Sequence, residues 1–463
     1  MAWRNVTVLS PDIDIQRVHA TLATHFDPAT PVWVGRAPGR LDVMGGIADY
    51  SGSLVLQLPL ALAAVAYVQL RTDGRVLVES RADESLLGSQ RAAFATRDVC
   101  ELGLDIARVR THLGADARTA WAAYIVGALS IVVQQTGVNL SGGVTILVDS
   151  DVPLGKGVSS SAAIEVATMR ALLGATGRDV DGTTLAIWCQ MVENLIVGAP
   201  CGIMDQMTSA CGTANTLLAL RCQPAELLPS IKLPSDLAVW GIDSGVRHAV
   251  SGADYGSVRV GAFMGLRMLE AHARQHNIPH EHWNGYLANV TPSEFAQSFA
   301  DVLPTQMSGA DFITRYGSHG DAVTTTDSSR QYPVRQSTIH PIYEHHRVQL
   351  YAHLVSGYQD VATAALMGEL MYQSHQSYSA CGLGSDATDA IVAAIRRADP
   401  ATGLYGAKIT GGGSGGTVAV LARHNASAAV QDIATTYGSG LVIRGSSDGA
   451  AHAPVTRWES FAR

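Results

Sequence analysis

The sequence predicts a mixed α/β fold in two domains. Runs rich in valine and leucine alternate with helical apolar patterns from about Val32 to Leu218, and such alternation is typical of α/β chains. The chain has 463 residues, more than one domain usually holds. Three prolines loosen the segment from Gln223 to Asp236, which is typical of a linker. We therefore place one domain at 1–222 and the other at 223–463.

Four segments carry clear element patterns. Leu54 to Leu70 is mostly apolar and uncharged, but it is shorter than the roughly 20 residues that span a bilayer, so we predict a buried strand. Val144 to Val148 is rich in β-branched residues and also predicts a strand. The polar stretch from Gly309 to Ser337, which contains TTTDSSRQYP, has no periodicity and predicts a long loop or insertion. Apolar residues at helical spacing predict one continuous helix: Trp121, Tyr124, Ile125, Ala128, Leu129 and Val132.

The composition excludes several classes of partner. The net charge is −8, and no lysine–arginine cluster supplies the basic face that a nucleic acid needs. The six cysteines form no CxxC pair, which predicts neither a disulfide framework nor a zinc site and favours a reducing cytoplasm. Met1 to Asp12 lacks the apolar run of a secretory signal. We expect no membrane partner, and a monomer or weak homodimer.

A glycine loop followed by serines stands between a predicted strand and a predicted helix. Pro153 to Ala163 reads PLGKGVSSSAA. Serine is a preferred N-cap, and a helix N-terminus offers free N–H groups to an anion. Gly155 and Gly157 would let the backbone approach phosphate oxygens. The segment does not match GxxxxGK[ST], and two interpretations stay open: an anion site, or an ordinary capped helix after a tight turn.

Two further segments are dense in glycine. Gly35 to Tyr50 reads GRAPGRLDVMGGIADY and follows a short predicted strand, and Lys408 to Thr417 reads KITGGGSGGT. The latter contains GxGxxG, but the strand-like run from Thr417 to Leu421 follows it where a dinucleotide-binding turn requires a helix. A glycine turn that closes over a ligand and a purely structural hairpin both remain open.

Two carboxylates lie in apolar surroundings. Glu193 belongs to a predicted helix, and Asp205 follows a glycine-containing turn in CGIMDQ. Phosphate chemistry uses Mg²⁺ held by one or two carboxylates and a hydroxyl, and an aspartate orients or deprotonates a hydroxyl nucleophile. The alternative for each residue is a solvated surface charge. Two other motifs fail, because HPIYEHH has the wrong spacing for a zinc protease and GGGSG precedes a strand rather than the helix of a serine hydrolase.

Taken in order, these segments resemble the GHMP small-molecule kinases, and among them the galactokinase branch. PLGKGVSSSAA is similar to the phosphate loop of that family, KITGGGSGG to its third motif, and GRAPGR with ADY to its sugar-binding motif. The resemblance covers roughly Val32 to Leu421. It implies a two-domain GHMP kinase fold, with an N-terminal ribosomal-protein-S5-like domain, a C-terminal ferredoxin-like domain and the active site between them.

The resemblance also implies roles for individual residues in an ATP-dependent and Mg²⁺-dependent sugar kinase. Asp205 corresponds to the catalytic aspartate and Arg40 to its partner, while Glu193 and a loop serine correspond to the Mg²⁺ ligands. Asp49, Gly202 and Tyr255 correspond to sugar-binding positions. The nucleotide phosphates would be wrapped by the phosphate loop, whose last serine is the metal ligand: Gly155, Lys156, Gly157, Val158, Ser159, Ser160 and Ser161.

One departure from the family pattern bears on the sugar. Galactokinases read GEHTDY where this chain reads GGIADY, so Gly46 and Ile47 replace a glutamate and a histidine that help to read the outer hydroxyls. L-Arabinopyranose has the shape of galactopyranose without its C6 hydroxymethyl group. GRLDVMGGIADYSGSLVLQ and CQPAE are also similar to segments of L-arabinokinases.

We therefore expect phosphorylation of L-arabinose at its anomeric hydroxyl. Two alternatives remain, a kinase for galactose or another sugar of the same branch, and a non-catalytic sugar and nucleotide sensor. The complete serine run from Ser159 to Ser161 argues against the sensor.

Overall fold

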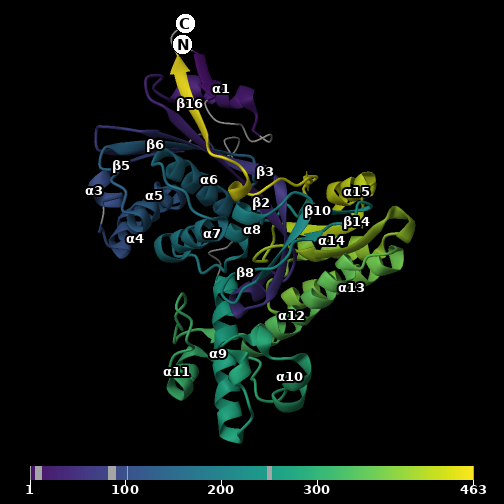
Figure 1. The fold of residues 1–463 in the computed structure, drawn as a ribbon. Coiled ribbons are helices and arrows are strands. Elements are labelled where there is room, and N and C mark those ends of the chain that lie inside the picture. Colours follow the sequence, from purple (N-terminus) through teal and green to yellow (C-terminus); the bar gives the residue numbers. More distant parts are fainter. Residues whose placement is uncertain (1, 6–12, 82–89, 102, 248–252, 462–463) are drawn as a thin grey trace.

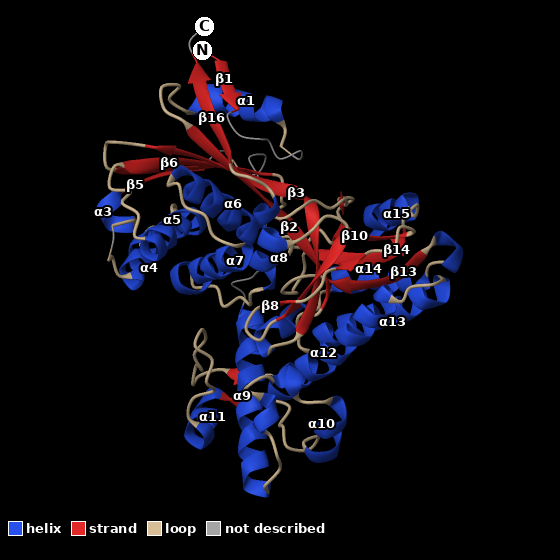
Figure 2. Cartoon of the chain, viewed as in Figure 1, coloured by secondary structure: helices blue, strands red, loops and turns tan. Residues whose placement is uncertain are grey.

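The computed structural model describes residues 2–5, 13–81, 90–101, 103–247 and 253–461. They form two large β-sheets with helices packed against each, and a helical extension with a two-stranded sheet at the bottom of the view (Figure 1, Figure 2). The expectation about a secretory signal concerns Met1 to Asp12, and most of these residues lie outside the described part of the chain. Among the described helices, none combines the length and the apolar character that crossing a bilayer requires.

The first sheet is built around β3 (Leu54–Leu70), which confirms the predicted buried strand. Along β3, Ala66 and Val68 pack into one core and Tyr67 into another, so both faces are covered there, which explains why the run is mostly apolar. Every pairing is antiparallel except that of β4 with β6. The other strands are β1 (Ala2–Asn5), β16 (Thr456–Phe461), β2 (Val32–Met44), β6 (Gly143–Ser150), β4 (Arg75–Ser80), β5 (Gln90–Ala95), β7 (Thr216–Arg221), β8 (Glu226–Leu227) and β9 (Ile231–Lys232).

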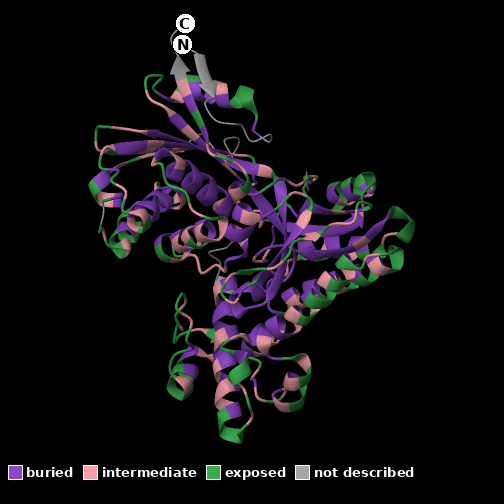
Figure 3. Ribbon diagram, viewed as in Figure 1, coloured by how far each residue is buried: buried purple, intermediate pink, exposed green. Residues whose placement is uncertain are grey.

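Helices cover one face of this sheet, and α1 (Ile15–His25) covers part of the other. Figure 3 shows that buried residues concentrate along the sheet and the helices nearest to it. A 3₁₀ turn at Ala120–Ala122 leads into α5, and β6 contains the run 144–148, so the predicted helix and strand are confirmed. The covering helices are α3 (Thr96–Val99), α4 (Ile106–Gly114), α5 (Ala123–Thr136), α6 (Ser160–Ala175), α7 (Gly182–Met191) and α8 (Met204–Cys211).

The second sheet has the strand order β13, β14, β10, β15, all antiparallel. The chain leaves the first sheet after β9 and enters the second at β10, while β16 returns to the first sheet beside β2. We propose that the boundary between the two domains lies in the proline-containing stretch before β10. The elements of this part are β10 (Leu237–Asp243), α13 (Val361–Ala380), α14 (Asp386–Arg397), β13 (Leu404–Ile409), β14 (Thr417–Arg423), α15 (Ser427–Tyr437) and β15 (Val442–Ile443).

A helical extension with its own apolar core projects from the second domain (Figure 1). It contains α9 (Ala253–His276), α10 (Pro292–Ser298), α11 (Gly309–Tyr316), the short strands β11 (Met307–Ser308) and β12 (Gln331–Tyr332), and α12 (Val334–Ser356). The prediction of a loop across 309–337 is wrong at both ends. The Ser308 side chain accepts a hydrogen bond from the Asp311 N–H and starts α11, and α12 begins at Val334.

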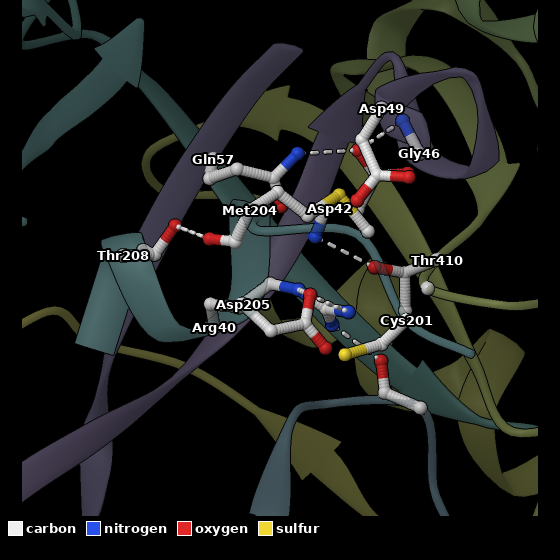
Figure 4. Close-up of polar contacts among 12 residues, drawn as sticks. Arg40, Asp42, Gly46, Asp49, Gln57, Cys201, Met204, Asp205, Thr208 and Thr410 are labelled. Atoms are coloured by element: carbon white, nitrogen blue, oxygen red, sulfur yellow. Dashed lines mark hydrogen bonds and ion pairs between the residues drawn. The ribbon is translucent and has the colours of Figure 1, made fainter. Parts of the chain in front are cut away.

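A buried ion pair joins the two sheets. Lys408 on β13 donates to Asp42 Oδ2 on β2, and both side chains are fully buried. Gln57 Nε2 and the Gly46 N–H donate to Asp42 Oδ1 at 2.7 and 3.0 Å, and Thr410 Oγ1 accepts from the Asp42 N–H at 2.7 Å (Figure 4). This charged contact therefore fixes the position of β13 in the second sheet relative to β2 in the first.

Replacing the cation alone should destabilise the protein strongly. Lys408→Met leaves the Asp42 carboxylate buried without its counter-charge, and we expect the free energy of unfolding to fall by about 3–5 kcal/mol. The double variant Asp42→Asn, Lys408→Met buries no charge and should recover most of this loss. Urea denaturation measures both, and a double variant no more stable than the single one would contradict the electrostatic origin.

Candidate active site

One pocket brings most of the predicted site residues together, and two of them lie outside its lining. Val158 is buried and accepts a hydrogen bond from the Arg40 N–H through its carbonyl. Lys156 Nζ lies 2.8 Å from Asp243 Oδ2, so its ammonium group ties the loop to the end of β10. The pocket is lined by Arg40, Ile47, Asp49, Gly155, Gly157, Ser159, Ser160, Ser161, Glu193, Cys201, Gly202, Met204, Asp205, Tyr255 and Gly412.

The N-terminus of α6 opens into this pocket without a side-chain cap. Ser159 is the N-cap residue, as the sequence predicts, but its φ of 60° is left-handed and its side chain makes no capping hydrogen bond. Ser159 Oγ is buried and has no hydrogen-bond partner. An ordinary capped helix would use that hydroxyl on its own N–H groups. The geometry therefore favours the anion site.

The third glycine segment packs directly on the phosphate loop. It forms the turn between β13 and β14, and the predicted strand after it is confirmed. Gly411 has φ +69°, and a Cβ there would lie 2.7 Å from the Gly157 carbonyl oxygen. A Cβ at Gly416 would lie 2.8 Å from the Lys156 carbonyl oxygen. Only glycine fits at these two positions. The turn therefore packs closely against the phosphate loop and supports it.

Arg40 connects the phosphate loop to Asp205. Its Nε and Nη2 donate to Asp205 Oδ1 at 2.9 and 2.7 Å, and its Nη1 donates to the Gly157 carbonyl at 2.7 Å (Figure 4). Asp205 lies in the first turn of α8 rather than in the preceding glycine turn, and the helix dipole favours a carboxylate there. The Arg40 side chain is 3% exposed and that of Asp205 is 22% exposed, so the carboxylate faces the pocket while the arginine lies behind it.

A second group of carboxylates borders the phosphate loop. Glu193 lies in a π-helical turn, Val192–Val197, that follows α7. Burial raises its pKa, and hydrogen bonds from Cys201 and Ser161 oppose the rise. Gln206 Nε2 donates to Glu193 Oε2 at 3.2 Å and to Glu165 Oε2 at 3.3 Å. Glu165 is fully buried, and burial followed by the charge of Glu193 raises its pKa strongly.

This group fits a divalent cation that also binds a phosphate. A hydroxyl and a carboxylate, from Ser161 and Glu193, suit Mg²⁺, which keeps several waters and takes oxygen ligands from phosphate. Behind the pair lies a further carboxyl group, that of Glu165, whose Oε1 is buried without a hydrogen-bond partner. The described residues contain no cluster of three or more histidine, cysteine, aspartate or glutamate side chains that would hold an ion alone.

Asp49 forms the opposite wall with Gly202 and Tyr255. Asp49 is buried and accepts the Tyr50 N–H at 2.6 Å. Burial and then the charge of Asp205 raise its pKa to about 7, against the opposing charge of Arg259. A Cβ at Gly202 would lie 1.7 Å from Asp49 Oδ2, so the glycine is required there. The Tyr255 ring meets the Tyr50 ring edge to face with centroids 6.1 Å apart.

Sequence reasoning missed the ion pair that supports this wall. Arg259 on α9 donates to both carboxylate oxygens of Asp321 at 2.7 and 2.8 Å, and to the carbonyls of Pro200 and Cys201 at 3.1 and 3.2 Å. Its guanidinium group lies 5.3 Å from the centroid of the Tyr50 ring. A single arginine in a helix and a single aspartate in a polar loop give no signal of this pairing.

The arrangement supplies the parts of a phosphoryl transfer to a hydroxyl. An anion site, an oxygen pair suited to Mg²⁺, and a carboxylate held by an arginine converge on one pocket. Asp49 and Tyr255 add polar groups at the opposite wall, where an alcohol substrate would be oriented.

Comparison with known families gives two matches along the chain. Residues 123–213 match the GHMP kinases N terminal domain, and residues 361–440 match the GHMP kinases C terminal domain. The first match contains the phosphate loop, Glu193 and Asp205, and the second contains the third glycine segment.

Individual relatives agree with these matches. An L-arabinokinase of Arabidopsis thaliana is 42% identical over 92% of this chain, and the chain spans 46% of that protein's length. A galactokinase of Streptomyces coelicolor is 30% identical over 63% of this chain and 71% of its own length. A crystal structure of Lactococcus lactis galactokinase complexed with galactose superposes with a TM-score of 0.72 at 20% identity, covering 94% of this chain and 98% of the other. This likeness confirms the predicted fold class.

The raised pKa of Asp49 gives a pH-dependent stability. Because this pKa is about 7 in the folded protein against the ordinary pKa of 3.8 for an aspartate, the folded state binds more protons between these values, and the contribution of Asp49 to stability falls as the pH rises through that window. Asp49→Asn should therefore be more stable than the wild type near pH 8 by on the order of 4 kcal/mol. The difference should shrink towards pH 4.

Urea denaturation of both proteins across this pH range measures the effect. Comparing the variant with the wild type isolates Asp49 from the other titrating carboxylates. A difference in stability that stays constant with pH would contradict the raised pKa.

Proposed function

Because the chain belongs to the GHMP kinase family, we propose that it transfers the γ-phosphoryl group of ATP to the anomeric hydroxyl of L-arabinose. The products are ADP and L-arabinose 1-phosphate. The observation that carries this proposal is the convergence of the Arg40–Asp205 pair, the uncapped α6 N-terminus and Asp49 on one pocket.

The nucleotide phosphates bind at the phosphate loop in this proposal. The first-turn N–H groups of α6 and the unpaired Ser159 hydroxyl face that position and are suited to phosphate oxygens. Ser161 and Glu193 would hold Mg²⁺, which neutralises charge on the phosphates when bound. Lys156 acts on the loop through Asp243, and so shapes the phosphate site indirectly.

Asp205 orients the anomeric hydroxyl towards the γ-phosphorus and accepts its proton. Arg40 holds one carboxylate oxygen of Asp205 and also the Gly157 carbonyl, so it fixes the nucleophile's partner relative to the loop. Because the transition state of phosphoryl transfer is loose in most analyses, this fixed placement supplies much of the rate acceleration.

The choice of L-arabinose rests on the part of the pocket wall that Ile47 lines, with Gly46 before it in the chain. This wall offers no carboxylate or imidazole to a C6 hydroxymethyl group, whereas Asp49 and Tyr255 remain for the ring hydroxyls. The similarity in sequence points the same way, since the relative at 42% identity is an L-arabinokinase and the galactokinase at 30% is more distant.

Two finer expectations belong to the same proposal. The six cysteines are free thiols, and we propose a cytoplasmic location on the grounds of cysteine usage given above. We also propose that the protein acts as a monomer or a weak homodimer.

Release of ADP with a panel of sugars tests the proposed function. The purified protein with ATP and Mg²⁺ should release ADP on addition of L-arabinose, with kcat/KM about 10–200-fold above that for D-galactose, because only packing against Ile47 excludes the extra hydroxymethyl group. A preference for D-galactose would overturn the sugar assignment. No ADP release with any sugar would overturn the kinase.

The variant Asp205→Asn tests the proposed role of Asp205 in the chemical step. The amide oxygen still accepts from Arg40 but takes up no proton, so we expect kcat to fall by about 10²–10⁴-fold. Binding of an ATP analogue, measured by calorimetry, should stay close to that of the wild type. Near-normal turnover would remove Asp205 from the proposed role.

The support that Gly411 gives to the phosphate loop is testable by substitution. Gly411→Ala places a methyl group 2.7 Å from the Gly157 carbonyl oxygen, so the loop must move and we expect the dissociation constant of an ATP analogue to rise by about 10-fold or more. Gly440→Ala is the matched control, because Gly440 has a similar φ of +85° and nothing lies within 4 Å of its Cβ position. Equal effects of the two variants on nucleotide binding would contradict the role of the contact.

A further inference from the structure

A tyrosine hydroxyl fills the place where a side chain at Gly46 would begin. Gly46 has φ +40°, and a Cβ built there would lie 1.5 Å from Tyr378 Oη and 2.8 Å from Tyr378 Cζ. Asp42 Oδ2 would lie 2.7 Å away on another side. Tyr378 comes from α13 of the second domain and is fully buried. No side chain fits at position 46 while this tyrosine is in place.

The same hydroxyl is bonded on two sides. It accepts the Ile47 N–H at 2.8 Å and donates to the Gly411 carbonyl at 3.1 Å. Burial raises the pKa of Tyr378 well above its ordinary value, so the group keeps its proton and remains a donor. The ring is held by His340, edge to face at 5.2 Å, and by the Lys408 ammonium group 5.1 Å from its centroid.

These contacts fix the backbone that carries Ile47. Ile47 lines the pocket with a hydrocarbon side chain, and its N–H is already used by Tyr378. At this wall the site therefore presents neither a side-chain donor nor a side-chain acceptor to a substituent of the bound sugar. A sugar whose ring carries a further hydroxymethyl arm would have to displace Ile47, and Tyr378 resists that displacement through the backbone.

We propose that Tyr378 is a specificity-determining residue of the sugar site. It acts as a positioning residue, because it closes position 46 to any side chain and holds Ile47 against the sugar. The inference rests on the proposed sugar kinase function, which it deepens. Galactokinases, by the resemblance stated above, carry an acidic side chain at position 46. Tyr378 therefore excludes from this protein the acidic side chain that galactokinases use at this position.

Removing only the hydroxyl oxygen tests this role. Tyr378→Phe loses the bonds to Ile47 and Gly411, and we expect the KM for L-arabinose to rise by about 10-fold with a smaller change in kcat. The ratio of dissociation constants for D-galactose and L-arabinose should fall by about 5–10-fold, because the Ile47 wall is loosened. Calorimetry in the presence of a non-hydrolysable ATP analogue measures this ratio without turnover.

Tyr351→Phe is the matched control. Tyr351 on α12 is equally buried, but its hydroxyl has no hydrogen-bond partner. The same oxygen is removed from a buried tyrosine, and the ratio of dissociation constants should not change. A similar shift in both variants would show a general effect of core loosening and would overturn the proposal.

A second variant asks whether Tyr378 alone blocks an acidic side chain at position 46. Gly46→Glu should destabilise the protein and abolish sugar binding, since Tyr378 Oη occupies its Cβ position. Because Cζ also lies too close, Tyr378→Leu makes more room than Tyr378→Phe. The double variant Gly46→Glu, Tyr378→Leu should therefore bind D-galactose better relative to L-arabinose than Tyr378→Leu does.

The outcomes separate this inference from the proposed function. If the wild type releases no ADP, the proposed kinase function is wrong. The ratio of sugar dissociation constants still tests the proposed role of Tyr378 in that case. An unchanged ratio in Tyr378→Phe overturns the inference even if the wild type is an active L-arabinose kinase. If the double variant does not fold, the comparison of Tyr378→Phe with Tyr351→Phe decides.

Discussion

The buried ion pair between Asp42 and Lys408 is the contact on which the geometry of the pocket depends. Asp42 stands two residues after Arg40 on β2, and the β2–β3 register shifts on either side of these two residues. Such bulges re-aim side chains next to functional sites. Lys408 is the penultimate residue of β13, and the glycine turn follows that strand. Thr410 in this turn accepts a hydrogen bond from the Asp42 N–H. A single charged contact therefore fixes the strand that carries Arg40 and the turn that supports the phosphate loop, although they lie more than 360 residues apart.

Near the pocket the protein buries three carboxyl groups whose charged forms are disfavoured by burial. Burial raises the pKa of Asp49, Glu193 and Glu165. Arg259, whose charge opposes the rise at Asp49, is already bonded to the Asp321 carboxylate. Such an arrangement costs stability, because each carboxylate loses its hydration. A divalent cation favours the ionised form of a carboxylate beside it, so a raised pKa of Glu193 in the folded chain agrees with the proposed Mg²⁺ position.

Sequence reasoning predicted the elements that depend on a local residue pattern. It did not predict contacts between residues that lie far apart in the chain. The strand at 54–70 and the helix at 121–132 were predictable because apolar residues repeat at regular spacing over many positions. The ordered glycine segments also indicated the phosphate site and its family. The sequence did not indicate the pairing of Arg259 with Asp321 or the contact of Tyr378 with Gly46. The residues of each pair lie far apart in the chain, and no recognisable motif contains both members of either pair. The loop predicted at 309–337 shows a smaller failure, in which a serine cap outweighs weak periodicity.

A continuous series of contacts also connects Ile47, which lines the pocket, to the phosphate loop. The Ile47 N–H donates to the Tyr378 hydroxyl, which donates to the Gly411 carbonyl. Gly411 abuts the Gly157 carbonyl, and that carbonyl accepts from Arg40, which holds the proposed catalytic carboxylate. Each contact depends on a close approach or a buried hydrogen bond, so none adjusts freely. In the proposed function, the protein therefore sets the distance between a bound sugar and a bound phosphate before either binds, and for a loose phosphoryl-transfer transition state such placement is the protein's main contribution to the rate.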